Sequence, residues 1–278
     1  MRRLVLDDAL HLLACPHCAG SLSRSQASVA CPNGHSFDVA RSGYLSLLPG
    51  DAQLGSADTA EMVAAREAFL AGGHYQPLVE ALVEAAERAP VPPGCVLDLG
   101  AGPGWYLARV LDRLSGRTGV ALDLSKHALR RAARAHPRIA AVACDVWRSL
   151  PVRDSVGALA LSVFAPRNGA ETARVLRPGG ALLVVTPTER HLAELVDRLG
   201  LLTVDERKQE RLGATLDAHL DLERRVEREW SMTLTAEDVV NAVAMGPSAR
   251  HATRRETGTE ATPVTASVTI SIYRARSG

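Results

Sequence analysis

The sequence predicts an α/β fold with a mostly parallel sheet, and three observations support that prediction. An apolar run at residues 95–99 passes directly into closely spaced glycines, as a buried strand does before a tight turn. Apolar residues then recur at helical spacing from Trp105 to Leu114. Further apolar runs follow at residues 119–124, 140–146, 158–164 and 181–186. Strand, glycine turn and helix in this order build a sheet whose carboxyl edge binds nucleotides.

Composition agrees with a globular protein. The 278 residues are 46% hydrophobic and 23% charged, which predicts a buried core and argues against disorder. A net charge of +1 is too balanced to indicate a nucleic-acid partner by itself. No apolar run approaches the length of a membrane span, and no secretory signal pattern opens the chain. We therefore expect a cytoplasmic protein without a membrane partner.

Cysteine and histidine residues cluster near the N-terminus. Cys15-Pro16-His17-Cys18 is followed by Cys31-Pro32-Asn33-Gly34-His35, so two pairs of ligands lie on tight turns joined by a short ribbon. His17 competes as a ligand, but it lies inside the first turn and would distort it. Cys95 and Cys144 lie in predicted strands and are interpreted as core residues. The spacing predicts a tetrahedral structural zinc site held by Cys15, Cys18, Cys31 and His35.

Between the zinc segment and the first strand, the sequence predicts helices. A Gly/Asp/Ser-rich stretch precedes a helix-like run at residues 59–70, for which Asp58 or Thr59 is the expected N-cap. A second helix-like run spans residues 79–88. We divide the chain into a zinc-binding module, a linker with helices, and the α/β domain, at residues 1–48, 49–90 and 91–278.

The glycine turn distinguishes between two kinds of cofactor. A dinucleotide fingerprint needs a glycine three places after the second one, whereas here that position is Trp105 and the glycines are Gly100, Gly102 and Gly104. Asp98 lies two residues before the first glycine, where its carboxylate can face an ammonium group. This arrangement resembles motif I of the class I S-adenosylmethionine (SAM)-dependent methyltransferases. The resemblance implies their Rossmann-like, seven-stranded, mostly parallel sheet.

Acidic residues end the next two predicted strands. Asp123 lies at about the twenty-residue offset of a ribose-binding carboxylate, which can accept both ribose hydroxyl protons. Asp145 is expected near the adenine amino group, as in other proteins of this fold. The alternative is that any one of these acids caps a helix or solvates a strand end. A Leu-Arg-Pro-Gly-Gly turn at residues 176–180, before the last predicted strand, is also common in these methyltransferases.

Motifs along nearly the whole chain resemble the RlmA family of zinc-containing 23S rRNA guanine-N1 methyltransferases. Besides the zinc pattern and motif I, they lie at residues 37–44, 65–70 and 73–78. Residues 162–168 and 245–248 resemble more closely the TlrB subgroup, whose methylation is associated with resistance to mycinosyl macrolides such as tylosin. Arg250 departs from that subgroup, which has an aromatic residue at this position.

The resemblance implies a substrate and a set of roles. The substrate would be a guanine in the hairpin 35 loop of 23S rRNA domain II, at position 748, or at 745 as in the other subgroup. The protein could also form a homodimer. The zinc ligands would be Cys15, Cys18, Cys31 and His35. The expected SAM contacts are Tyr75, Asp98, Gly100, Gly102, Pro103, Asp123, Asp145 and His191.

Methyl transfer to guanine requires protein groups that act on the guanine base itself. Loss of the guanine N1 proton puts negative charge on O6, which a hydrogen-bond donor would stabilise. Arg167 follows the fourth predicted strand and is the candidate donor; the alternative is a phosphate contact or a surface salt bridge. No residue identifies itself as the general base.

RNA contact is expected from local basic patches. Between Arg109 and Arg138 the chain carries eight Lys/Arg and two acids, with Arg130, Arg134 and Arg138 on one predicted helical face. A solvated helix is the alternative explanation. The zinc module, with Arg2, Arg3, Arg24 and Arg41, is the favoured RNA-reading element.

Two other classes of function remain open from the residues alone. One is a SAM-dependent methyltransferase of a small molecule, in which the zinc module is purely structural. The other is a nonenzymatic nucleic-acid-binding protein with a decayed methyltransferase fold. The intact glycines and the three acids argue against decay.

Overall fold

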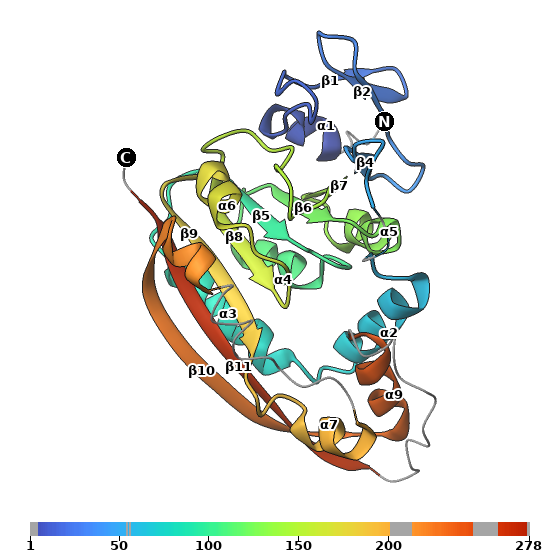
Figure 1. The fold of residues 1–278 in the computed structure, drawn as a ribbon, viewed down its shortest axis with the longest axis vertical. Helices are drawn as coiled ribbons and strands as arrows, with labels where there is room; N and C mark the ends of the chain where they lie inside the picture. The colour runs from blue at the N-terminus through green and yellow to red at the C-terminus, as the bar shows by residue number, and fades with distance from the viewer. Residues whose placement is uncertain (1–4, 54, 56, 201–212, 247–260, 277–278) are drawn as a thin grey trace.

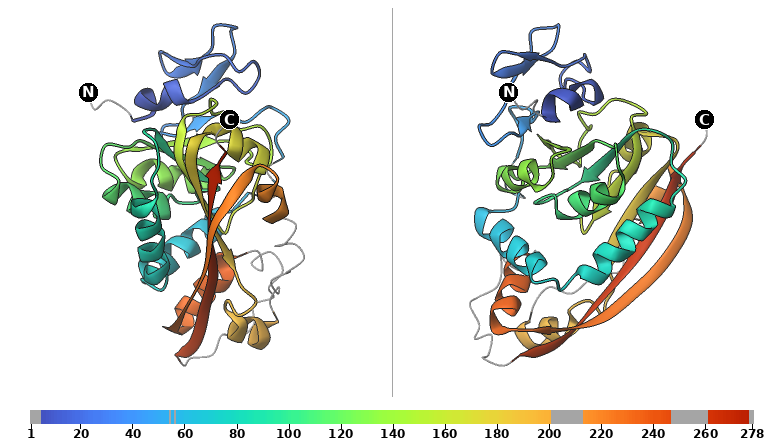
Figure 2. Two further views of the ribbon diagram at one scale, coloured as in Figure 1. Left: turned by 90° about the vertical axis from the view of Figure 1, so that its left-hand side faces the viewer. Right: turned by 180° about the vertical axis from the view of Figure 1, so that it is seen from behind.

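The structure, a computed structural model, describes residues 5–53, 55, 57–200, 213–246 and 261–276. Within this part of the chain, a small sheet has the strand order β1-β2-β3, and a main sheet has the order β10-β11-β9-β8-β5-β6-β7-β4. The small sheet lies at one end of the molecule (Figure 1, blue; Figure 2). The predicted α/β fold is confirmed. Outside the described residues lie Arg2, Arg3, Pro247, Ser248 and Arg250.

The centre of the main sheet is parallel, and its strands coincide with the five predicted apolar runs. Every residue of β5, β7 and β8 is buried, as expected where both faces of a sheet are covered. The predicted turn at residues 176–180 instead lies inside the first part of β9, where the register with β8 shifts. These strands are β5 (Cys95–Leu99), β6 (Gly119–Asp123), β7 (Ile139–Ala143), β8 (Gly157–Val163) and β9 (Leu176–Pro187).

Further strands complete both edges of the sheet. A long antiparallel pair, β10 (Leu220–Leu234) and β11 (Thr262–Ala275), joins through β11 to β9 and forms the curved outer edge in Figure 1. At the other edge, β4 (Leu45–Ser46) pairs in parallel with β7. Because β4 comes from the expected zinc module, the main sheet has, within the described residues, one strand more than the seven that the resemblance implied.

Helices cover the sheet, and polar side chains define where several of them begin. Thr59 caps α2 by accepting a hydrogen bond from the Met62 amide, which confirms one of the two predicted caps. Ser125 and Asn168 cap α5 and α6 in the same way. No helix among the described residues is long and apolar enough to cross a membrane. The helices whose bounds fall within the described residues are α1 (Val5–Ala9), α2 (Ala60–Ala71), α3 (Gln76–Arg88), α4 (Trp105–Arg113), α5 (Lys126–Ala135), α6 (Gly169–Val175), α7 (Ala193–Leu199) and α9 (Ala236–Ala244), with a 3-10 turn at Leu10–Leu12.

Two apolar cores lie on opposite faces of the sheet, because alternate residues of each strand point to opposite sides. The first core contains Val96 and side chains of α3, α4 and α5. The second contains Leu97, side chains of α1, and Val29 and Phe37 of the small sheet. The small sheet, β1 (Ser23–Ser25), β2 (Ser28–Ala30) and β3 (Ser36–Asp38), therefore shares a core with the main sheet. The expected boundary at residue 48 does not separate two independent cores.

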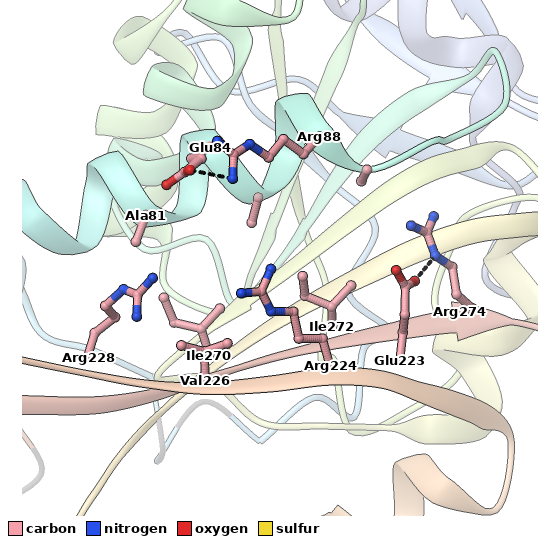
Figure 3. Close-up of a pocket in the computed structure, with 12 residues that line it drawn as sticks. Ala81, Glu84, Arg88, Glu223, Arg224, Val226, Arg228, Ile270, Ile272 and Arg274 are labelled. Carbon is pink, nitrogen blue, oxygen red and sulfur yellow. Dashed lines mark hydrogen bonds and ion pairs between the residues drawn. The ribbon is translucent and has the colours of Figure 1, made fainter.

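A groove runs between α3 and the β10–β11 pair (Figure 3). Its lining includes the apolar side chains of Val226, Ile270 and Ile272, and arginines stand along it. Arg88 pairs with a glutamate of its own helix at 2.7 Å, and Arg274 pairs with a glutamate of β10. The groove thus mixes both signs of charge.

Candidate metal and cofactor sites

The predicted zinc ligands meet at one point. The ligand atoms of Cys15, Cys18, Cys31 and His35 all lie within 4.8 Å of one another. The Sγ atoms of Cys18 and Cys31 are 3.7 Å apart, and His35 Nδ1 lies 3.5 Å and 3.3 Å from the Sγ atoms of Cys15 and Cys31. Zn–S bonds of about 2.3 Å in a tetrahedron place two sulfurs about 3.8 Å apart. The four side chains therefore fit a tetrahedral zinc ion.

Local backbone structure brings the ligands together. In the first turn the Cys15 amide donates to the Gly20 carbonyl at 2.9 Å, and in the second the Cys31 amide donates to the His35 carbonyl at 3.0 Å. A hydrogen bond from the Gly20 backbone lowers the pKa of Cys18 to about 6, which favours the thiolate that a metal requires. His17, the competing ligand, instead stacks on Phe37 with 5.9 Å between ring centroids.

The three positions after β5 require glycine for different structural reasons. Gly100, Gly102 and Gly104 have φ values of +79°, +54° and +77°, which favour glycine. A Cβ at Gly100 would lie 2.6 Å from the Ala165 Cβ, and one at Gly104 would lie 3.1 Å from Ala132. Gly102 faces only the end of the Arg66 side chain, at 3.5 Å. Protein packing thus requires the outer glycines, whereas only the end of one flexible side chain lies near Gly102; a contact from Gly102 to SAM stays a prediction.

Asp98 is the second-to-last residue of β5 and is an acidic side chain in a buried position. Its side chain is 2% exposed, and its Oδ2 has no hydrogen-bond partner within the described part of the chain. Burial, and to a smaller extent the nearby charge of Asp123, raise the pKa of Asp98 to about 8. A buried carboxylate is stable when an opposite charge reaches it. The ammonium group of SAM is such a charge, so this residue fits the cofactor.

Asp123 fastens the glycine turn. One carboxylate oxygen accepts from the Gly102 amide at 2.8 Å and the other from the Ser125 amide at 2.7 Å. Burial raises the pKa of Asp123, and these two amide hydrogen bonds lower it. Each oxygen keeps a further lone pair for a ribose hydroxyl. Asp123 therefore has a structural role in the turn, and its expected role as an acceptor for the ribose hydroxyls stays a prediction.

Asp145 has a local role that the sequence had left as an alternative. Its Oδ1 accepts from the Trp147 amide at 3.0 Å, and its carbonyl accepts from the Arg148 amide at 3.1 Å. The side chain thereby closes the turn after β7. A contact from Asp145 to adenine stays a prediction.

Tyr75 and His191 lie 116 residues apart and form a hydrogen bond of 2.9 Å between Oη and Nε2. His191 Nδ1 accepts from the Ser267 amide at 3.2 Å, and burial lowers the pKa of His191 to about 4. The ring is therefore neutral at pH 7, with its proton on Nε2. The structure thus joins two of the expected SAM contacts, while Pro103 lies in the glycine turn.

Arg66 and Phe164 belong to this region, although sequence reasoning assigned neither a role. Arg66 comes from α2, forms an ion pair with Asp58 and donates to the Met245 carbonyl at 2.7 Å. The Phe164 ring centroid lies 5.6 Å from that of His191. Arg66 lies in the family motif at residues 65–70 and Phe164 in the one at residues 162–168, so the family resemblance is the sequence signal that marks both residues.

Arg167, the candidate donor to O6, is 7% exposed. Burial lowers the pKa of Arg167, while the nearby phenol of Tyr273 raises it. Tyr273 belongs to the second core, whereas Tyr75 belongs to the first, on the other face of the sheet. This placement favours a structural role, and the O6 role stays a prediction.

The basic run at residues 109–138 is largely bound to the protein itself. Arg138 lies beyond the end of α5 and donates to three backbone carbonyls, so it does not share a helical face with Arg130 and Arg134. Arg117 donates to two carbonyls, and Arg113 and Arg131 pair with glutamates. The structure therefore leaves fewer cations for RNA than the sequence count suggested.

Comparisons with known proteins agree with these sites. A family model described as RlmA, N-terminal, a zinc ribbon, matches residues 13–53, and a methyltransferase-domain model matches residues 96–180. A 23S rRNA (guanine(748)-N(1))-methyltransferase of Streptomyces fradiae is 50% identical over 246 residues, 88% of either chain. A putative 23S rRNA (guanine-N(1)-)-methyltransferase of Micromonospora griseorubida is 49% identical and covers 96% of this chain and 98% of its own. A Bacillus subtilis protein of the same description is 31% identical over 66% of this chain and 67% of its own.

Proposed function

The chain belongs to the RlmA family of 23S rRNA (guanine-N1)-methyltransferases, and from this premise we propose that its target is guanine 748 in the hairpin 35 loop. The observation that carries the proposal is the 50% identity to the Streptomyces fradiae enzyme, whose name specifies position 748. Residues 162–168, which resemble the TlrB subgroup, lie beside the glycine turn, because Ala165 is the residue that a Cβ at Gly100 would meet. We also propose a cytoplasmic location, which an rRNA substrate supports.

The chemistry divides between cofactor and protein. When bound, SAM would supply the methyl group of its sulfonium for transfer to N1, with S-adenosylhomocysteine as the leaving group, and the N1 proton would have to pass to a base. Asp98 and Asp123 would hold the ammonium and the ribose. A guanine in a loop costs little to unstack, and its N1 is then exposed.

The zinc ribbon is the proposed RNA-reading element. Two of the four arginines predicted to contact RNA lie within the described residues. Arg24 pairs with Asp7 at 3.2 Å, whereas Arg41 is exposed. We infer that the hairpin 35 loop lines the peptide tunnel, where a methyl group would hinder the binding of a bulky glycosylated macrolide. We therefore include resistance to mycinosyl macrolides in the proposal.

Primer extension tests the target directly, because an N1 methyl group blocks base pairing and stops reverse transcriptase one nucleotide short. Expression in a host without its own enzyme should create a stop at 748 and raise the inhibitory concentration of tylosin. A Gly102→Asp variant, which should block SAM binding, provides the control. A stop at 745 would move the target to the other subgroup's position. No stop in the hairpin, with tritiated methyl groups reaching only small acceptors, would overturn the proposal.

A further inference from the structure

Phe164, directly after β8, has a backbone conformation that a phenylalanine adopts at a cost. Its φ is +52°, in the left-handed region where a side chain with a Cβ is disfavoured. The Phe164 amide still donates to the Val185 carbonyl at 3.1 Å, so the residue remains attached to β9. The bend turns the side chain outward, and the residue is 40% exposed. Strain that exposes an apolar ring indicates a function for that ring.

The surroundings of the ring place it at the cofactor site. Its centroid lies 5.6 Å from that of His191 and 6.1 Å from that of Tyr75, the two residues joined by the 2.9 Å hydrogen bond. The next residue, Ala165, packs against Gly100 of the glycine turn. The Phe164 ring therefore lies against a neutral, hydrogen-bonded pair of rings, and the residue that follows it lies against the glycine turn.

We propose that Phe164 is the surface on which the target purine stacks when it leaves the RNA loop. The inference rests on the proposed function and adds to it the residue that positions the base. Stacking holds a base by its face and leaves its Watson–Crick edge, which carries N1, free to point at the cofactor. The Tyr75 and His191 rings contact the Phe164 ring in tilted arrangements and hold it in place before RNA binds.

Another exposed aromatic side chain helps to isolate this role. Trp147 is 55% exposed and lies in the turn after β7. Within the described residues, no ring contact joins Trp147 to Tyr75 or His191. Trp147→Ala is therefore a matched control, because it removes an exposed aromatic ring at the same edge of the sheet.

The test measures methyl transfer from tritiated SAM to a 23S rRNA transcript, with SAM affinity measured by calorimetry on the same protein. Phe164→Ala and Phe164→Leu should each lower kcat/KM about tenfold to a hundredfold, the effect of losing one base–aromatic stack. Their SAM affinity should change by less than about twofold. Phe164→Tyr and Phe164→Trp should retain most activity, and Trp147→Ala should lose less than Phe164→Ala.

The backbone strain supplies a second readout. Phe164→Gly should keep or raise the melting temperature, since glycine accepts a positive φ, while it loses methyl transfer as Phe164→Ala does. Wild-type activity in Phe164→Leu, or a loss of SAM affinity in proportion to activity, would overturn the stacking role. If Phe164→Ala fails to fold, the comparison of Leu with Tyr decides. A wild-type enzyme that methylates no guanine in the transcript would instead overturn the proposed function, and with it the base that Phe164 is proposed to hold.

Discussion

The strands of the zinc ribbon and those of the parallel sheet bury very different shares of their residues. In β2 and β3 only Val29 and Phe37 are buried, whereas every residue of β5, β7 and β8 is buried. A segment with so little core needs a metal to fold, while the sheet can fold on apolar burial alone. The ribbon therefore depends on the bound metal for its fold, whereas the sheet folds by itself and thereby forms the cofactor site.

Removing a zinc ligand should have the largest effect and would test this contrast directly. We expect Cys31→Ser to lose zinc and unfold the ribbon, because structural zinc binding contributes about 10 kcal/mol or more to folding. RNA methylation should be abolished, while SAM affinity stays within about twofold. Elemental analysis, limited proteolysis and calorimetry measure the three results.

Cys95→Ser, in buried β5, is the matched control and should retain zinc. Absence of zinc from freshly purified wild-type protein would contradict the assignment of the zinc site. Loss of SAM binding in Cys31→Ser would show instead that the shared second core makes the sheet depend on the ribbon.

A smaller effect is expected at the cofactor site. Asp123→Ala removes the acceptor of the Gly102 and Ser125 amides as well as that of the ribose. Loss of a charged hydrogen-bond acceptor should weaken SAM by about 1.5–3 kcal/mol, or roughly 10- to 150-fold. Calorimetry measures this, with the exposed Asp112→Ala on α4 as control. Unchanged affinity in Asp123→Ala would contradict the assignment of the ribose site.

The smallest effect is a pH dependence that arises at Asp98. In the cofactor-free protein the pKa of Asp98 is about 8, so below pH 8 the carboxyl group carries a proton that it must release to pair with an ammonium. SAM affinity should therefore fall as pH decreases from 8, by at most about tenfold per pH unit. Calorimetry in buffers of different ionisation enthalpy should show proton release on binding. Asp98→Asn should abolish this dependence, and an identical pH profile in that variant would refute the role of Asp98.

The contrast also explains which features were predictable from sequence. The zinc ligands and five strands are encoded by short-range patterns, and each appeared where predicted. The Tyr75–His191 hydrogen bond joins residues 116 positions apart, and only the resemblance pointed to them. Local patterns carry no information on contacts of this kind.

Other features depend on partners that the sequence does not reveal. The two residues of β4 are too few for a strand signal, and they become a strand only by pairing with β7. In β10 charged residues dominate, so it lacks the apolar run that marked the other strands. Arg138 was assigned to a helical face because periodicity does not show that α5 ends at Ala135.

The pairing of β4 with β7 has a mechanical consequence. Two hydrogen-bonded residues and a common core attach the ribbon to the edge of the sheet, so the ribbon cannot swing as a tethered module would. The distance from the zinc site to the glycine turn is therefore fixed by the fold. If the ribbon reads RNA as proposed above, an rRNA segment that contacts both the ribbon and the glycine turn must span that distance, so the enzyme would select its substrate by shape as well as by sequence.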